Sequence, residues 1–266
     1  MEIAIESFAV FGGLGIKLDL DTPLGDLIQE HILDRYKYLR NDISSYISKD
    51  DLFPFILNGA ATGDRRTNST FKRARVAYND GMDCIEDLLD IGVIKLESSF
   101  TNNSASQRIL FTSPFVRFWF AFISPLFRGI KDGNYQEFYT AFKNRQMEFT
   151  QLIFEQLCFE YVKLYFKDEQ IYNIGRYWDD KTEINLLAKT KDGKIIAGAC
   201  RYTNSKIKKS ELSKLKEDCQ KAGIKPDFLM FFAKKGYTSE LKSLKNDTLK
   251  LFTCRNLKVL AENNHR

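Results

Sequence analysis

The alternation of apolar and polar positions is clearest over residues 178–205, where it predicts two β-strands joined by a tight turn. The first strand, Glu183–Thr190, is apolar and partly β-branched, and the second covers residues 194–202. Asp192-Gly193 between them is a typical hairpin turn. A lysine-rich helix and another apolar strand, Phe228–Ala233, follow. This order of elements predicts an α/β core in the carboxy-terminal part of the chain.

Residues 4–21 predict two short strands around a glycine turn. Apolar residues then recur every three or four positions over residues 24–47, which predicts one long amphipathic helix. Thr22 is its expected N-cap, with Pro23 at the first helical position. The apolar face of this helix can belong to the core or meet a partner.

An aromatic-rich segment, residues 113–166, is helical in pattern. Pro125 is expected to kink or end its first helix. A last helix over residues 148–166 is expected to lead into the α/β core, whose first strand is predicted over residues 171–177. Aromatic residues interleaved with arginines can stack bases, but at helical spacing they more often form a core.

Between these parts, residues 51–114 have the element order of a winged helix-turn-helix. The predicted elements are helices over 52–57, 68–79 and 82–91, a strand over 93–97, a polar wing tip over 101–104 and a strand over 108–112.

The helix before the wing would enter the major groove in such a domain, but here it is acidic. It carries Asp83, Glu86, Asp87 and Asp90, which phosphates would repel, so DNA recognition by this helix is disfavoured. The basic residues lie one element earlier. They can hold a nucleic-acid backbone or pair with the acidic helix: Arg65, Arg66, Lys72, Arg73 and Arg75.

Composition narrows the class of protein. A chain of 266 residues, 44% hydrophobic and 28% charged, can form two modest globular domains. Five scattered cysteines without a C-x-x-C pair argue against a disulfide framework or a zinc site and favour a reducing cytoplasm. The longest apolar stretch, residues 115–127, is interrupted and too short for a membrane span, so no membrane partner is expected.

Charge is unevenly distributed along the chain. Residues 1–100 hold 11 Lys/Arg and 17 Asp/Glu, whereas residues 201–266 hold 16 and 7. The basic last third directly follows the predicted hairpin. Polyanion binding and a merely solvated lysine surface explain this pattern about equally well.

Several segments together resemble the carboxy-terminal domain of archaeal-type ATPases, a domain of unknown function that is similar to PD-(D/E)XK nucleases. They are LFTSPFVRFWFAFISPLFRGIKDGNYQEF, FEQLCFEYVKLY and the hairpin pattern W(x4)EIN(x12)GACRY, and the resemblance covers roughly residues 70–235. It implies a winged-helix-like region followed by a restriction-endonuclease-like α/β core. The family's ATPase module has no counterpart, and no Walker motif occurs, so ATP is not an expected ligand.

The resemblance also assigns positions to an active site. The helix glutamate of the family falls on Glu155 and the strand glutamate on Glu183. The two metal-binding acids fall on Asn185 and Ala199, and the catalytic lysine falls on Arg201. Mg²⁺ needs carboxylate oxygens, and a permanently protonated arginine cannot act as a base. The implied nuclease site is therefore degenerate.

Three functions remain as expectations. The first is a catalytically inactive nuclease-like protein that binds nucleic acid, DNA in preference, without a cofactor. The second is a protein-interaction module that docks a partner or itself. The third, a minority view, is a Mg²⁺-dependent nuclease rebuilt on Glu155 and Glu183. The expected nucleic-acid contacts are Arg201, Lys206, Lys208, Lys209 and Lys214, together with the five basic residues between 65 and 75.

The predicted domain organisation has four parts. Residues 1–50 form an amino-terminal hairpin and long helix, 51–114 a winged-helix-like domain, 115–147 an aromatic helical connector, and 148–266 the nuclease-like core.

Overall fold

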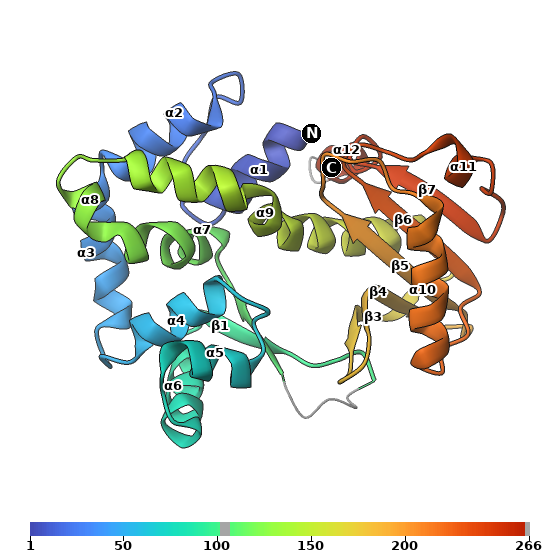
Figure 1. Cartoon of the computed structure of the whole chain (residues 1–266), viewed down its shortest axis with the longest axis horizontal. Helices are drawn as coiled ribbons and strands as arrows, with labels where there is room; N and C mark the ends of the chain where they lie inside the picture. The colour runs from blue at the N-terminus through green and yellow to red at the C-terminus, as the bar shows by residue number, and fades with distance from the viewer. Residues whose placement is uncertain (102–106, 264–266) are drawn as a thin grey trace. The chain divides into compact units, whose positions relative to one another are not determined.

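The computed structural model describes residues 1–101 and 107–263 (Figure 1). The chain divides into two compact units. Of the described residues, the helical unit comprises 6–98 and 107–146, and the sheet unit comprises 1–5, 99–101 and 147–263. Helices and a five-stranded mixed sheet occur together, which confirms the α/β fold class. The predicted boundaries near residues 50, 114 and 147 stay predictions, because compactness alone does not show independent folding.

The amino-terminal segment is a helix, so the expected pair of strands is wrong. Helix α1 spans Glu2–Phe11, and its buried residues Ile5 and Ala9 lie one helical turn apart. The glycine turn follows the helix. Gly13 has a φ of +91°, and a Cβ at this position would lie 2.5 Å from Oγ of Ser113.

The helix expected over residues 24–47 is interrupted in the structure. It consists of α2 (Leu24–Ile28), the π-helix η1 (Gln29–Leu33) and α3 (Tyr36–Ile47). The break falls at Arg35, whose φ of −101° and ψ of 14° lie outside the helical region. Pro23, not Thr22, is the N-cap residue, and the Thr22 hydroxyl donates instead to Asp19 Oδ2 at 3.3 Å.

The next five elements follow the predicted order, with shifted ends. They are α4 (Phe53–Ala61), α5 (Thr67–Ala74), α6 (Tyr78–Asp90), β1 (Ile94–Glu97) and β2 (Arg108–Phe111). Strands β1 and β2 pair in antiparallel fashion. Helix α5 ends early because Arg75 adopts a left-handed conformation, with φ of 57°. Most of the predicted wing tip, residues 102–104, lies outside the described residues.

The aromatic segment contains a succession of short helices before one long one. These are α7 (Pro114–Phe118), the π-helix η2 (Trp119–Ile123), the 3₁₀-helix η3 (Ser124–Leu126), α8 (Phe127–Lys131) and α9 (Gln136–Tyr165). Pro125 lies in the 3₁₀ turn, as expected for a helix-ending proline. The last helix begins at Gln136, twelve residues before its predicted start at 148, where Asn134 Oδ1 accepts the Gln136 N–H.

Packing of aromatic rings fills the core of the helical unit. Phe118 meets Phe138 and Phe142 edge to face, and Phe122 also meets Phe142 edge to face at 5.3 Å. All four side chains are buried. These aromatic residues therefore form a core, as their helical spacing favoured.

The sheet unit is built on strands in the order β3-β4-β5-β6-β7. The strands are β3 (Ile171–Trp178), β4 (Glu183–Thr190), β5 (Ile195–Arg201), β6 (Phe228–Ala233) and β7 (Leu249–Thr253). The first three are antiparallel, and β5, β6 and β7 are parallel. The hairpin expected around Asp192-Gly193 is thus present.

Helices cover the two faces of this sheet. Helix α10 (Lys209–Lys221) buries Leu212, Leu215 and Cys219 in a core cluster with Ala197 and Phe231. The carboxy-terminal part of α9 packs on the opposite face through aromatic contacts with Phe232 and Phe252. Two further helices that the sequence pattern did not indicate are α11 (Ser239–Lys242) and α12 (Lys258–Asn263).

Two expectations from the sequence concern disulfides and membrane-spanning helices. The five cysteines are buried and free of disulfides. Among the helices described, none is both long and apolar enough to cross a membrane.

The hydroxyl of Tyr237 connects the parallel strands. It lies within hydrogen-bond distance of the carbonyl oxygens of Phe231 (2.7 Å) and Phe252, and it accepts the Phe252 N–H at 3.1 Å. The side chain is buried, and this burial raises the pKa of Tyr237, so the hydroxyl stays protonated.

Removing this hydroxyl should destabilise the sheet unit. We expect Tyr237→Phe to lower the free energy of unfolding by about 1–3 kcal/mol, because buried backbone groups lose a partner. Urea unfolding followed by intrinsic fluorescence measures the change. Tyr172→Phe is the matched control, since Tyr172 is 75% exposed and should show no change. Equal stability of the two variants would contradict the structural role of Tyr237.

Candidate functional site

The structure brings most of the residues expected at the hairpin into one network, but not all. Glu183 is exposed at the start of β4, and Asn185 is half-buried two residues further along. Ala199 is buried in the core cluster beneath α10, with no polar atom on its side chain. Arg201, at the end of β5, is the last of the five positions and is half-buried.

Glu155 is the anchor of the network. Its side chain projects from α9, is 5% exposed, and accepts the Nε–H of Arg176 on β3 at 2.7 Å. Arg176 is 1% exposed, and its guanidinium also lies over the ring of Phe159, 5.0 Å from the centroid. A buried carboxylate of this kind is stable only with a cation and further hydrogen bonds beside it.

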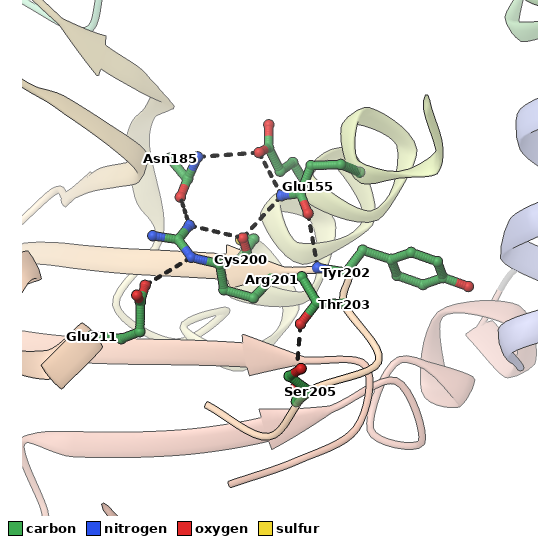
Figure 2. Close-up of polar contacts among 9 residues, drawn as sticks. Glu155, Asn185, Cys200, Arg201, Tyr202, Thr203, Ser205 and Glu211 are labelled. Carbon is green, nitrogen blue, oxygen red and sulfur yellow. Dashed lines mark hydrogen bonds and ion pairs between the residues drawn. The ribbon is translucent and has the colours of Figure 1, made fainter. Parts of the chain in front are cut away.

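The other carboxylate oxygen of Glu155 is also engaged. Oε1 accepts Nε2–H of Gln151 at 2.7 Å and Nδ2–H of Asn185 at 3.2 Å. Asn185 in turn accepts a hydrogen bond from Nη1 of Arg201 (Figure 2). The amide of Asn185 thus joins the buried carboxylate to the arginine at the end of the next strand.

Arg201 is held on a second side by helix α10. Its Nε donates to Glu211 Oε2 at 2.9 Å, and its Nη1 also donates to the Cys200 carbonyl at 3.1 Å (Figure 2). Within the part of the chain that the structure describes, Nη2 makes no hydrogen bond. The network therefore alternates in charge, from Arg176 through Glu155 and Arg201 to Glu211.

Gln151, Arg176 and Glu211 are the members that sequence reasoning missed. Gln151 Nε2 donates to the Cys200 carbonyl at 2.9 Å, and its Oε1 accepts the Tyr202 N–H at 2.8 Å. One amide thereby satisfies both kinds of backbone group at the end of β5. The available signal was spacing, because Gln151 precedes Glu155 by four residues and shares its helix face.

The side chains present do not fit a Mg²⁺ site. Both oxygens of Glu155 are occupied by protein donors, Asn185 offers one neutral carbonyl that already binds Arg201, and Ala199 offers none. No group of three His, Cys, Asp or Glu side chains within residues 1–101 and 107–263 could hold a metal ion. What the arrangement can do is hold a guanidinium in a fixed position.

A pocket of about 200 Å³ opens beside Arg201. Three cations and three hydroxyl side chains line it, in addition to Glu211 and Ile207: Arg201, Lys206, Lys208, Thr203, Ser205 and Ser210. Lys206 and Lys208 are exposed and form no ion pair with any described residue. Two other lysines were expected here. Nζ of Lys209 lies 3.9 Å from Oε1 of Glu240, and Lys214 is exposed on α10. These contacts favour an anionic ligand.

The five basic residues between positions 65 and 75 differ in burial and in partners. Arg73 donates to Asp64 Oδ1 and to the Gly59 carbonyl, both at 3.3 Å. Its described acidic partner therefore belongs to the loop before α5, and pairing with α6 is wrong for Arg73. Lys72 and Arg75 are exposed without an ion pair among the described residues. Arg65 and Arg66 lie half-buried at the start of α5, Arg65 with a φ of 64°.

Helix α6 is acidic on its surface, as its sequence suggests. Asp83, Glu86, Asp87 and Asp90 are all exposed. The carboxylate of Asp50 lies near the buried Cys84 thiol. Burial is the larger cause and this carboxylate the second, and together they raise the pKa of Cys84 to about 11. The thiol is thus protonated at neutral pH and unsuited to nucleophilic chemistry.

Fold and site together define an α/β protein with a five-stranded mixed sheet and a buried Glu–Arg network at its strand ends. The model of one family, DUF234, described as "Archaea bacterial proteins of unknown function", matches residues 119–215. The matched range runs from η2 into α10 and includes Gln151, Glu155, Asn185 and Arg201. No curated protein and no solved structure matches the chain.

Removing the anchor carboxylate should be costly. We expect Glu155→Ala to destabilise the sheet unit by about 3–5 kcal/mol, because the buried Arg176 would lose the carboxylate that accepts its Nε–H. Hydrogen exchange of β3, β4 and β5 peptides, measured by mass spectrometry, reports this locally.

The control lies on the same helix. Glu160 forms an exposed pair with Lys163 at 2.8 Å, and Glu160→Ala should cost at most about 1 kcal/mol. Similar exchange rates in both variants would contradict the anchoring role of Glu155.

Proposed function

We propose that this chain is a catalytically inactive nuclease-like protein that binds nucleic acid, DNA in preference, through the basic surface around the end of β5. Two features observed side by side carry the proposal: a carboxylate that is unavailable to a metal ion and cations that are available to a ligand. Glu155 is neutralised by Arg176, whereas Lys206 and Lys208 line an open pocket without ion pairs among the described residues.

The resemblance to PD-(D/E)XK nucleases supports the first half of this proposal. The DUF234 match covers the aromatic segment and the hairpin on which that resemblance depends. Asn185 and Arg201, which stand where an acid and a lysine are expected in that family, now bond to each other. A pair of this kind stabilises the strand ends without holding a metal ion or a base.

The charge distribution supports the second half. Residues 201–266 hold 16 Lys/Arg against 7 Asp/Glu. Binding dominated by phosphate contacts needs a basic surface rather than a sequence-reading helix. In the helical unit the helix expected in the reading position, α6, exposes carboxylates, so we place the DNA contact on the sheet unit. A cytoplasmic location is part of the proposal, because buried free thiols suit a reducing compartment.

Charge removal at the pocket tests the binding surface. Lys206→Ala/Lys208→Ala should weaken binding of a labelled DNA duplex and make the negative slope of log K against log salt shallower by about 2. The control Lys167→Ala/Lys191→Ala removes the same charge near the other end of β5 and should change neither value. Fluorescence anisotropy at several salt concentrations measures both. Equal losses in the two double variants, or no binding by the wild type, would sink the proposal.

Catalytic inactivity is tested separately. Incubated with Mg²⁺ or Mn²⁺ and either single- or double-stranded DNA, the purified chain should produce no cleavage, because Glu155 has no free oxygen for a metal. Cleavage that disappears in Glu183→Ala would show that the carboxylates form a relocated site. It would replace inactivity with a metal-dependent nuclease.

A second candidate rests on charge complementarity. The exposed carboxylates of α6 and the exposed lysines of α10 can associate head to tail between two copies or dock another protein. The test is the molar mass of the protein in solution without DNA. A mass that falls as the salt concentration is raised favours this interaction module over nucleic-acid binding.

A further inference from the structure

The helical unit carries a groove that combines aromatic rings and cations on the same surface. It is formed by two neighbouring pockets of about 220 and 470 Å³, which share Tyr36. Helix α3, packed against α8, contributes to both. This aromatic–basic groove, defined by the residues lining the two pockets, has no part in the site described above.

Aromatic side chains line the first, smaller pocket. The rings of Tyr36 and Trp119 stack at 5.7 Å with an interplanar angle of 3°, and both are nearly buried. Phe127 stands at the rim, 40% exposed, with Arg128 5.9 Å from the centre of its ring. Trp119 belongs to the π-helix η2, a rare form that is frequent at functional sites.

Positive charge surrounds this surface. Arg35, Lys37 and Arg40 on or beside α3 and Lys131 on α8 are exposed in the two pockets. The one acidic side chain among the lining residues is Asp34, whose Oδ1 already accepts the Tyr135 hydroxyl at 2.9 Å. Burial raises the pKa of Tyr36, and the positive charge of the adjacent Arg40 opposes that rise. The net field of the groove favours anions.

We propose that the aromatic–basic groove binds single-stranded nucleic acid, with a base stacked at the Phe127 rim of the smaller pocket and phosphates held by Lys37, Arg40 and Lys131. Stacking and backbone neutralisation are the two terms that such binding requires. The proposed cations come from two helices, Lys37 and Arg40 from α3 and Lys131 from α8, so they can contact more than one phosphate. This surface is separate from the pocket proposed for duplex DNA, which contains no aromatic side chain.

The test compares single strand with duplex. A labelled oligonucleotide of about 20 nucleotides, longer than the site of a typical single-strand binding domain, is titrated by anisotropy. We expect Lys37→Ala/Arg40→Ala to lower the affinity for this oligonucleotide about tenfold. The negative slope of log K against log salt should become shallower by about 2. Phe127→Ala should lower affinity about fivefold or more without changing the slope, because stacking neutralises no phosphate.

A charge-matched control is available in the same unit. Lys95→Ala/Lys143→Ala removes two exposed lysines outside both pockets and should change single-strand affinity less than twofold. Thermal unfolding of each variant verifies that these exposed substitutions leave the helical unit folded. Equal losses in both double variants, or wild-type binding by Lys37→Ala/Arg40→Ala, would overturn the proposal.

Competition distinguishes the source of the ligand. Unlabelled single strand should displace the probe, whereas unlabelled duplex or mononucleotide at the same nucleotide concentration should not. Displacement by either at equal concentration would contradict a single-strand site. The variant Lys206→Ala/Lys208→Ala should retain single-strand affinity, so failure of the groove and failure of the proposed duplex-binding pocket are seen in different variants.

Discussion

The buried ion pair of Glu155 and Arg176 is the interaction on which the sheet unit depends. Both side chains are almost fully removed from water, which is costly for either charge alone. The pair is tolerated because each carboxylate oxygen of Glu155 has at least one protein donor. It ties α9 to β3 directly and to β4 through Asn185. The same satisfaction of lone pairs that makes the charge stable removes its capacity to bind a metal ion.

The network also holds the end of β5 beyond its last pairing with β4, on the side opposite β6. The β4–β5 ladder includes Leu186 and Gly198 as its last pair towards this end. Past that point the Gln151 amide bonds to the backbone of Cys200 and Tyr202, and Arg201 is clamped by Asn185 and Glu211. Side chains thus fill the hydrogen-bonding capacity at the end of β5, and the exposed cations Lys206 and Lys208 lie in the pocket beside it.

The two proposed surfaces differ in chemistry and hence in ligand. The pocket of the sheet unit offers cations and hydroxyls, which suit the phosphates of the proposed duplex ligand. The groove of the helical unit adds the exposed ring of Phe127, on which an accessible base can stack. Both lie on elements whose cores are well packed, the first against the cluster beneath α10 and the second against the phenylalanine core. Rigid support of this kind limits the ordering that binding would require.

Local pattern was sufficient where an element is regular and its residues are apolar. The sequence by itself determined the α/β class, the order of the helices from α4 to α6, the hairpin of β4 and β5 and the strand β6, because period-two and helical alternation are properties of neighbouring residues. It misassigned α1. The apolar residues of this segment are spaced for a helix, but no clear local signal distinguishes a helix from a strand there. It also missed the break at Arg35 and the π-helix η2, which depend on how side chains pack.

For the candidate site the division is sharper. The resemblance found in the sequence pointed to Glu155, Asn185 and Arg201, and it implied that two acids and a lysine are absent. Only the tertiary structure decided that Asn185 bonds to both of the others and that Ala199 is core. It also supplied Arg176 and Glu211, which are distant in sequence from their partners. The aromatic–basic groove was likewise out of reach, since α3 and α8 are about ninety residues apart. Side chains that meet through long-range packing leave no periodic trace in the chain, and that is why the fold class could be predicted while the chemistry of the site could not.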